Sequence, residues 1–358
     1  MLVFKKKIYS YLYIFFLVLV FFFNEFSTNK GLSKNYNISN IEVEEVYDIS
    51  FDKSKVADKA FNKAFKILFY KLVENKDKSK INLISLKDKK SLIENFSIND
   101  EIFVDNKYIA KFDVQFNKTK ILSYLNNKGV IPSSPIKIES FILPIFMDTN
   151  LNELYYLNQN NFYKNWNSNI KNYHLIQYIL PNEDIEDYNI IKKNINNIEN
   201  YNFKEITEKY NLKNEIILII QKSNSLIRVF SKIKFDKKNF ISNDIYNLYD
   251  IENEEEMKSI IFNIKDNYED KWKSTNKINT SLELPIKLSI DASNAKFSEK
   301  LENNLSSIDL VSNFKIEMFN NNEIIYKIIF NGSPNKLLNI MSLYNFKIDT
   351  SKEIWKVK

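Results

Sequence analysis

Residues 310–330, LVSNFKIEMFNNNEIIYKIIF, predict a β-hairpin in which two apolar-rich strands flank the turn Asn320-Asn321-Asn322. Strand and helix patterns continue on both sides of this hairpin. The flanking elements are expected to be strand Leu282–Ile290, helix Asn294–Ser306, helix Pro334–Tyr344 and strand Ile354–Val357. This β-α-β-β-α-β order predicts a ferredoxin-like module over residues 279–358.

The preceding segment, residues 136–274, predicts a second α/β layer module because strand and helix patterns alternate along it. Its first strand, Ile138–Phe146, is strongly apolar, which is typical of burial on both faces. The later elements are expected to be helix Asn160–Ile170, hairpin Glu215–Gln221 with Leu226–Phe235, and a long helix that begins near Glu254.

Residues 41–129 predict a first α/β module in the order β-α-α-β-β-α. Its elements after the opening strand are expected to be helix Lys53–Val73, a short helix Lys87–Phe96, hairpin Glu101–Phe116 around Asp105-Asn106, and helix Lys118–Asn127. Gly129 is suited to end the last helix in the left-handed conformation. The run VIPSSP, residues 130–135, predicts a linker to the second module.

The first 26 residues predict an export signal or a membrane anchor. Lys5, Lys6 and Lys7 precede the run from Ile8 to Phe23, in which only Ser10 is polar. With the lysines held in the cytoplasm, the remainder of the chain is expected on the far side of the membrane, after a flexible tether over residues 27–40. The predicted fold class is therefore mixed α+β and α/β, with an N-terminal signal-anchor helix followed by three small α/β modules.

Two fates of the N-terminal segment remain open. No small-residue cleavage site follows Phe23, so an uncleaved anchor in the inner membrane facing the periplasm is as well supported as a cleaved signal. Cleavage would instead leave a soluble periplasmic protein. The chain contains no cysteine, so a lipid-modified cysteine is excluded.

The rare residues exclude several kinds of site. Glycine occurs only at 31, 129 and 332, so neither a P-loop nor a dinucleotide-binding turn can be built. His174 is the single histidine and cysteine is absent, which excludes a two-histidine metal site, thiolate sites and disulfides. No cofactor and no nucleotide are therefore expected. The formal net charge of +6 falls to +4 beyond residue 28, and the interleaved lysines and acids give no basic stripe for nucleic acid.

Few residues stand out as candidate site residues. His174 lies beside an apolar strand without a partner for proton transfer, and the acids at 183–187 follow Pro181 at a helix start, where the helix dipole favours them. Phe162 and Trp166 share a helix face next to Tyr163; core packing is the favoured interpretation, and a partner-binding anchor is the alternative if that face is exposed. A surface position is the favoured interpretation of Arg228, the only arginine, and a specific carboxylate contact is the alternative that its rarity suggests.

Several blocks resemble an exported proteobacterial family known as domain of unknown function 2066, in its alphaproteobacterial form. The resembling segments are helix Lys53–Val73, strand Tyr108–Phe116, the run Phe141–Phe146, the segment Gln159–Trp166, Asn331-Gly332 with Leu337, and Trp355. The chain departs from the family pattern in having one of its two tryptophans and lacking its proline in the fourth segment. The resemblance implies an envelope location and no particular reaction.

The sequence thus favours a non-catalytic protein of the cell envelope that is held at the membrane by its N-terminal segment and binds other envelope proteins. The alternative is a hydrolase of cell wall or lipid that uses carboxylate or serine chemistry. It lacks the glycines of a nucleophile elbow and a histidine with an identifiable partner. Binding to anionic lipid is a third hypothesis, which the interleaved charge weakens.

Overall fold

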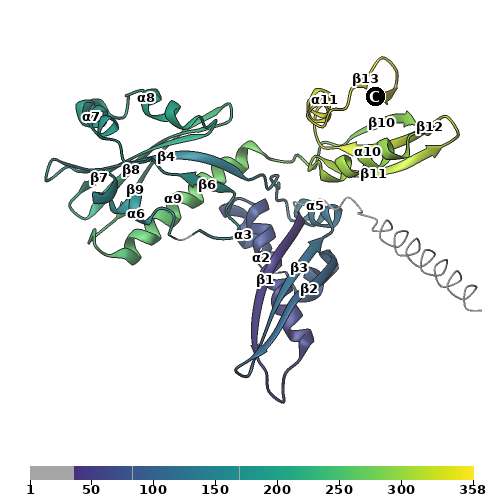
Figure 1. Cartoon of the computed structure of the whole chain (residues 1–358), viewed down its shortest axis with the longest axis horizontal. Coiled ribbons are helices and arrows are strands. Elements are labelled where there is room, and N and C mark those ends of the chain that lie inside the picture. The colour runs from purple at the N-terminus through teal and green to yellow at the C-terminus, as the bar shows by residue number, and fades with distance from the viewer. Residues whose placement is uncertain (1–35, 83, 169) are drawn as a thin grey trace, which may run out of the picture. The chain divides into compact units, whose positions relative to one another are not determined.

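The computed structural model describes residues 36–358 apart from 83 and 169 (Figure 1). These residues form a mixed α and β fold with three sheets, of three, six and five strands, in agreement with the expected class. The predicted anchor, residues 1–26, and residues 27–35 of the predicted tether lie outside the described residues. The described chain divides into two compact units, residues 36–284 with 331–333 and residues 285–330 with 334–358.

The tether prediction is wrong for residues 36–40, because the first strand, β1, spans Asn37–Val46. The Tyr36 side chain is fully buried, and Asn37 and Ile38 pair with Gln115 and Val114 of strand β3. Ile38 extends the apolar alternation of Ile41 and Val43 across a register shift at Asn40, which has a φ of 59°. The bulge hides that alternation in the sequence.

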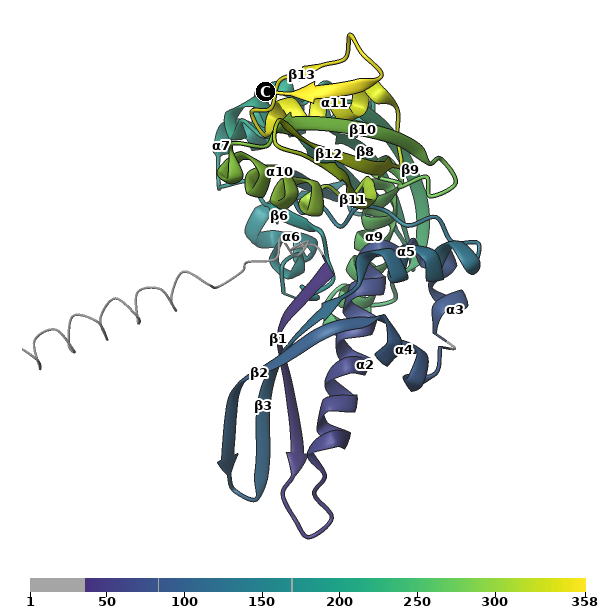
Figure 2. The same cartoon turned by 90° about the vertical axis from the view of Figure 1, so that its right-hand side faces the viewer.

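The first sheet has the order β1-β3-β2, with β2 spanning Ile93–Val104 and β3 spanning Lys107–Phe116. Helix α2, Lys53–Leu72, lies along it (Figure 2) and buries two of its three alanines and its three phenylalanines in the core that it forms with β1 and β3. The β2–β3 turn at Asp105-Asn106 is as predicted, and both residues have positive φ. Helix α5, Lys118–Asn127, closes the module.

The predicted helix Lys87–Phe96 is too long at its C-terminal end. Helix α4 spans Leu86–Leu92, and β2 begins at Ile93. Phe96 and Ile98 pair with Val114 and Phe112 of β3, so sheet pairing replaces the helical conformation that the local pattern suggested.

The second sheet has the order β5-β4-β7-β8-β9, and β6 also pairs with β4. The strand bounds are β4 Ile138–Asp148, β5 Glu153–Tyr155, β6 Ile176–Ile179, β7 Glu215–Ser223, β8 Leu226–Phe235 and β9 Lys238–Asn247. Strand β4 is parallel to β6 and β7, whereas β7, β8 and β9 form an antiparallel meander.

Helices cover the two faces of this sheet unequally. Helix α9, Glu254–Thr275, and helix α6, Asn161–Asn165, pack on one face, and the predicted apolar stripe of α9 is buried there. The other face is covered over β4 and β7 by the segment that carries α7, Ile185–Lys193, and α8, Lys204–Thr207. The predicted helix Asn160–Ile170 is shorter than expected, since α6 ends at Asn165.

The predicted linker at 130–135 is an ordered, buried segment. Ser133 donates its backbone N–H and its hydroxyl to Leu72 O, and Ser134 N donates to Asn276 O. Ile278 N donates in turn to Pro132 O. Residues 41–129 and 136–274, which the sequence separated, therefore lie within one compact unit.

The C-terminal unit contains the predicted elements and one additional strand. They are β10 Leu284–Asp291, α10 Ala295–Ser307, β11 Val311–Phe319, β12 Glu323–Phe330, α11 Pro334–Leu343, β13 Ile348–Asp349 and β14 Ile354–Val357. The sheet order is β11-β12-β10-β14-β13. The short β13 reverses the chain once more, so β14 lies parallel to β10 and antiparallel to β13, a departure from the simple ferredoxin-like order.

Within the described residues, no helix is both long and apolar enough to cross a bilayer.

Candidate functional site

Phe162 and Trp166 are core residues and not an exposed partner anchor. Both side chains are fully buried against the second sheet, and Trp166 packs edge-on against Tyr178 with 5.6 Å between ring centroids. Asn160 caps the short helix α6, which turns both rings inward. Tyr163 is half-buried, and its hydroxyl donates to Pro181 O at 2.9 Å.

His174 is also buried, next to a stripe of buried charges on α9. Its Nδ1 lies 3.4 Å from Lys171 N, and its Nε2 has no hydrogen-bond partner among the described residues. Burial, reinforced by the nearby Lys265, lowers the pKa of His174 to about 4. The ring is therefore neutral near pH 7, and the described residues give it no carboxylate partner of the kind that a general base requires.

The charged stripe on α9 consists of Lys265, Glu269 and Lys273, spaced four residues apart and each almost fully buried. Lys265 Nζ donates to Trp166 O. The Glu269 carboxylate accepts from the N–H groups of Leu175 and Ile176, and Lys273 Nζ donates to the carbonyls of Tyr70 and Val73. Each charge thus fixes the backbone of another segment, which is a structural role.

The acids that follow Pro181 form a structural cluster. Asp184 caps α7 by accepting from Glu186 N, and Lys209 Nζ contacts both Asp184 and Asp187 at 2.7 Å. The Lys209 ammonium lowers the pKa of Asp184 through its hydrogen bond, which keeps that carboxyl ionised. In the described part of the chain, no three His, Cys, Asp or Glu side chains gather as metal ligands.

Arg228 makes a specific carboxylate contact, which was the less favoured of the two interpretations of its rarity. Its guanidinium bonds Glu199 through both terminal nitrogens and also donates to Gln221 Oε1 at 2.8 Å. Glu199 raises the pKa of Arg228 further, so the pair remains charged. The contact ties β8 to the segment that follows α7.

Strand β9, which the sequence did not predict, presents an open edge of this unit. β9 is the last strand of its sheet and pairs residue for residue with β8, without a bulge or a proline. Ile241 and Ile245 point away from α9, and each is 69% exposed. A long, regular edge strand with exposed apolar side chains is open to pairing with another chain.

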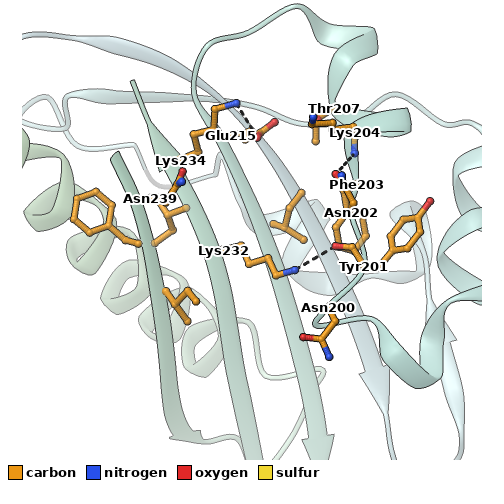
Figure 3. A pocket seen from close by; sticks show the side chains of 14 residues that line it. Asn200, Tyr201, Asn202, Phe203, Lys204, Thr207, Glu215, Lys232, Lys234 and Asn239 are labelled. Atoms are coloured by element: carbon orange, nitrogen blue, oxygen red, sulfur yellow. Dashed lines mark hydrogen bonds and ion pairs between the residues drawn. The ribbon is translucent and has the colours of Figure 1, made fainter. Parts of the chain in front are cut away.

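A groove of about 370 Å³ runs beside β9, where the covering layer of α7 and α8 ends (Figure 3). One wall is formed by Tyr201, Phe203 and Thr207, and the opposite side by β8 and β9. Ile217 and Ile241 line its apolar part. The groove exists because the segment from α7 to α8 covers β4 and β7 and contacts β8 through Glu199 and Tyr201, but leaves β9 open.

Three lysines give the groove a positive charge. Lys232 Nζ donates to Tyr201 O at 3.2 Å and Lys234 pairs with Glu215 at 3.2 Å, as Figure 3 shows. Lys204 also lines the groove. Burial lowers the pKa of Lys232, with a weaker opposing effect of Glu199. Among the described lining residues, Glu215 is the sole carboxylate, so the groove has a net positive charge.

A second exposed apolar surface lies at the far end of the first sheet. Val46 and Val104 flank Lys107 across the three strands, and Tyr47 contacts Phe103 with 5.0 Å between ring centroids. Val46, Tyr47, Ile49, Ile102, Phe103 and Val104 are all at least 45% exposed. Clustered apolar exposure of this kind is typical of contact surfaces.

No profile of a known protein family matches the chain, and no curated protein matches it.

Signals for β9 in the sequence are weak. Its alternation places Ile241 and Ile245 on the outward side and Phe240 and Tyr246 on the inward side, while Ser242 and Asp244 interrupt the inward pattern. The usable signal was the turn Asp236-Lys237 directly after strand β8, in which Asp236 has a φ of 55°.

Proposed function

We propose that this chain is a non-catalytic protein of the cell envelope that binds an extended acidic and apolar segment of another envelope protein along strand β9. The observation that carries the proposal is the combination of an open edge strand, two exposed isoleucines and a lysine-rich groove on the same sheet face. The exposed apolar end of the first sheet supports an interaction role as well.

Strand addition explains why these features occur together. A partner strand that pairs with β9 would continue the sheet and satisfy the free main-chain groups of that edge. Every second side chain of that strand would lie on the face that carries Ile241 and Ile245. Apolar side chains would cover the isoleucines, and acidic side chains would reach Lys232 and Lys204 in the groove.

The proposed location rests on the N-terminal sequence. The Lys5–Lys7 cluster and the apolar run Ile8–Phe23 favour export with the described units in the periplasm, either anchored in the inner membrane or released by cleavage. We further propose membership of the family known as domain of unknown function 2066. In this proposal the chain has a signal-anchor before its two compact units, the second a variant of the ferredoxin-like arrangement.

Cell fractionation tests the location. The protein is expected in the envelope fraction, with its bulk protected from added protease until the outer barrier is opened. Mass spectrometry of the mature N-terminus then distinguishes a retained anchor from a cleaved signal. Recovery in the cytosol would refute the export proposal.

Binding of a defined peptide tests the site. A fluorescent extended peptide in which every second residue is serine, and the residues between them are valine and aspartate in turn, places both side-chain types on one face and is expected to bind. The same design with lysine in place of aspartate is not. Ile241→Glu should weaken binding at least about tenfold, because it removes apolar contact area and places a like charge beside the acidic peptide. High salt should also weaken binding.

Leu151→Glu is the matched control for this experiment. Leu151 is 62% exposed in the turn between β4 and β5, so the variant makes the same apolar-to-acid change away from the groove. It should bind the peptide as the wild type does. Equal weakening in both variants would show that total charge, and not the β9 face, governs binding, and would contradict the proposed site.

A further inference from the structure

A second cluster of lysines lines a cleft on the same unit, away from the groove at β9. The cleft has a volume of about 740 Å³ and lies where the start of β1 and one side of α2 meet residues 137 and 172–173. Lys63, Lys66 and Lys71 of α2 and Lys137 before β4 line it. Ile38 and Ile41, both buried, contribute an apolar part to the lining.

The four ammonium groups have no carboxylate partner among the described residues. Lys63 Nζ donates to the backbone carbonyl of Glu42 at 2.9 Å, and Lys66 Nζ lies 5.5 Å from the centroid of the Tyr70 ring. Glu42 is the one acidic residue in the described lining. Exposed lysines on this protein commonly pair with a nearby acid, as Lys59 does with Glu45 and Lys90 with Asp58.

Lys71 is the lysine of the cleft whose charged form is disfavoured by its surroundings. Burial, together with the repulsion of Lys137, lowers the pKa of the Lys71 ammonium. No acidic residue acts on it in the opposite direction. An anion in the cleft would compensate both effects, since it would restore a hydrogen-bonding partner and neutralise the repulsion.

We propose that this cleft binds a phosphate-type anion that carries at least two negative charges, either as a free oligophosphate or as the headgroup of a phospholipid. Several lysines around one small volume match a compact, multiply charged group better than a single carboxylate. Side-chain amides of Asn37 and Asn172 in the lining offer further donors. This proposal is independent of strand addition at β9, because the two sites share no residue.

Calorimetric titration of the full chain with tripolyphosphate tests the proposal. One tripolyphosphate is expected to bind per chain, more weakly as salt is added. The double variant Lys66→Gln, Lys137→Gln should weaken binding at least about tenfold, because two charge-assisted contacts are lost. Both side chains are exposed, so thermal unfolding of the variant should match that of the wild type.

Lys192→Gln with Lys193→Gln is the matched control, since it also removes two exposed lysines but from the end of α7, outside both the cleft and the groove at β9. It should leave tripolyphosphate binding unchanged. Equal affinity in the wild type and the cleft variant, or equal weakening in the control, would overturn the proposal.

Acetylation of Lys71 provides a second measurement. Its lowered pKa predicts faster reaction than the average lysine at neutral pH, and tripolyphosphate should protect it. Mass spectrometry after brief treatment with acetic anhydride would show both effects. An unprotected Lys71 under saturating tripolyphosphate would contradict binding in the cleft.

Vesicles distinguish the two sources of the anion. One outcome is that the protein sediments more strongly with vesicles that contain phosphatidic acid than with phosphatidylcholine vesicles. If the double variant Lys66→Gln, Lys137→Gln loses this difference, the anion is a lipid headgroup. Tripolyphosphate binding without that difference would assign a soluble oligophosphate. Failure of both probes would reject the site.

Discussion

The burial of the charged stripe on α9 could not be predicted from the identity of its residues. Lys265, Glu269 and Lys273 lie on a helix that also carries many solvent-facing charges, and nothing in the sequence distinguishes them. Their partners are backbone groups of distant segments, which only the fold brings near. The rarity of Arg228 suggested a carboxylate contact only as an alternative to the favoured surface position, and its partner Glu199 was not predicted.

His174 and Glu269 predict opposite pH dependences of stability. Burial raises the pKa of Glu269 from 4.5 to about 7, so its contribution to stability is complete below about pH 4.5 and is lost as pH rises through 7. Burial lowers the pKa of His174 from 6.5 to about 4, so its contribution is complete above pH 6.5 and is lost as pH falls through 4. Each effect is worth up to roughly 3 kcal/mol.

Urea unfolding between pH 4 and pH 7 tests this opposition. Relative to the wild type, His174→Gln should become less stable as pH rises, because Glu269 then acts without compensation. Glu269→Gln should become more stable over the same range. Parallel pH dependences in the two variants would contradict the assigned pKa shifts.

At the scale of single elements, the sequence predicted helices better than edge strands. Helix α9 and the C-terminal cap of α5 were predicted because their signals are local: a long apolar stripe and a glycine. Strand β9 was not predicted, because an edge strand that is half exposed on one face lacks a clean apolar alternation. The candidate site therefore lies on an element that local pattern could not reveal.

Gly129 supports a quantitative prediction for the α5 cap. Its φ is 64°, Val130 N donates to Leu125 O and Gly129 N donates to Asn126 O, which together form a Schellman motif. A Cβ at this position would meet no atom within 4 Å. Gly129→Ala should therefore cost only the left-handed backbone strain, about 1 kcal/mol in the free energy of unfolding.

Chemical denaturation checks this value, and Gly129→Asn is the control. Asparagine tolerates the left-handed conformation better than alanine, so its cost should be smaller. Identical stability of the wild type and the alanine variant would show that the left-handed conformation at residue 129 places no strain on alanine.

At the scale of the whole molecule, the sequence placed a boundary where the structure has none. The proline-containing run at 130–135 has the composition of a linker, but the hydrogen bonds of Ser133, Ser134 and Pro132 hold it between the end of α2 and residues 276–278. A linker-like composition indicates a flexible segment only when its backbone N–H and C=O groups lack partners within the protein. In residues 130–135 backbone groups of Pro132, Ser133 and Ser134 are hydrogen-bonded.

We expect the C-terminal unit to fold without the rest of the chain. A fragment over residues 279–358 contains the five-stranded sheet with α10 and α11 and includes Leu282, whose carbonyl accepts from Asn331 at 2.9 Å. It should unfold cooperatively by circular dichroism, and Leu305→Ala, which truncates a fully buried side chain, should destabilise it by about 2–5 kcal/mol. A disordered proton spectrum of the fragment would contradict its autonomy.

Amide hydrogen exchange of the full chain with the valine–aspartate peptide tests strand addition at β9 most directly. New pairing should slow exchange of amides within residues 238–247, and the protection should disappear in Ile241→Glu and persist in Leu151→Glu. Peptide binding without added protection in β9, or with protection confined to another strand, would contradict the proposed site.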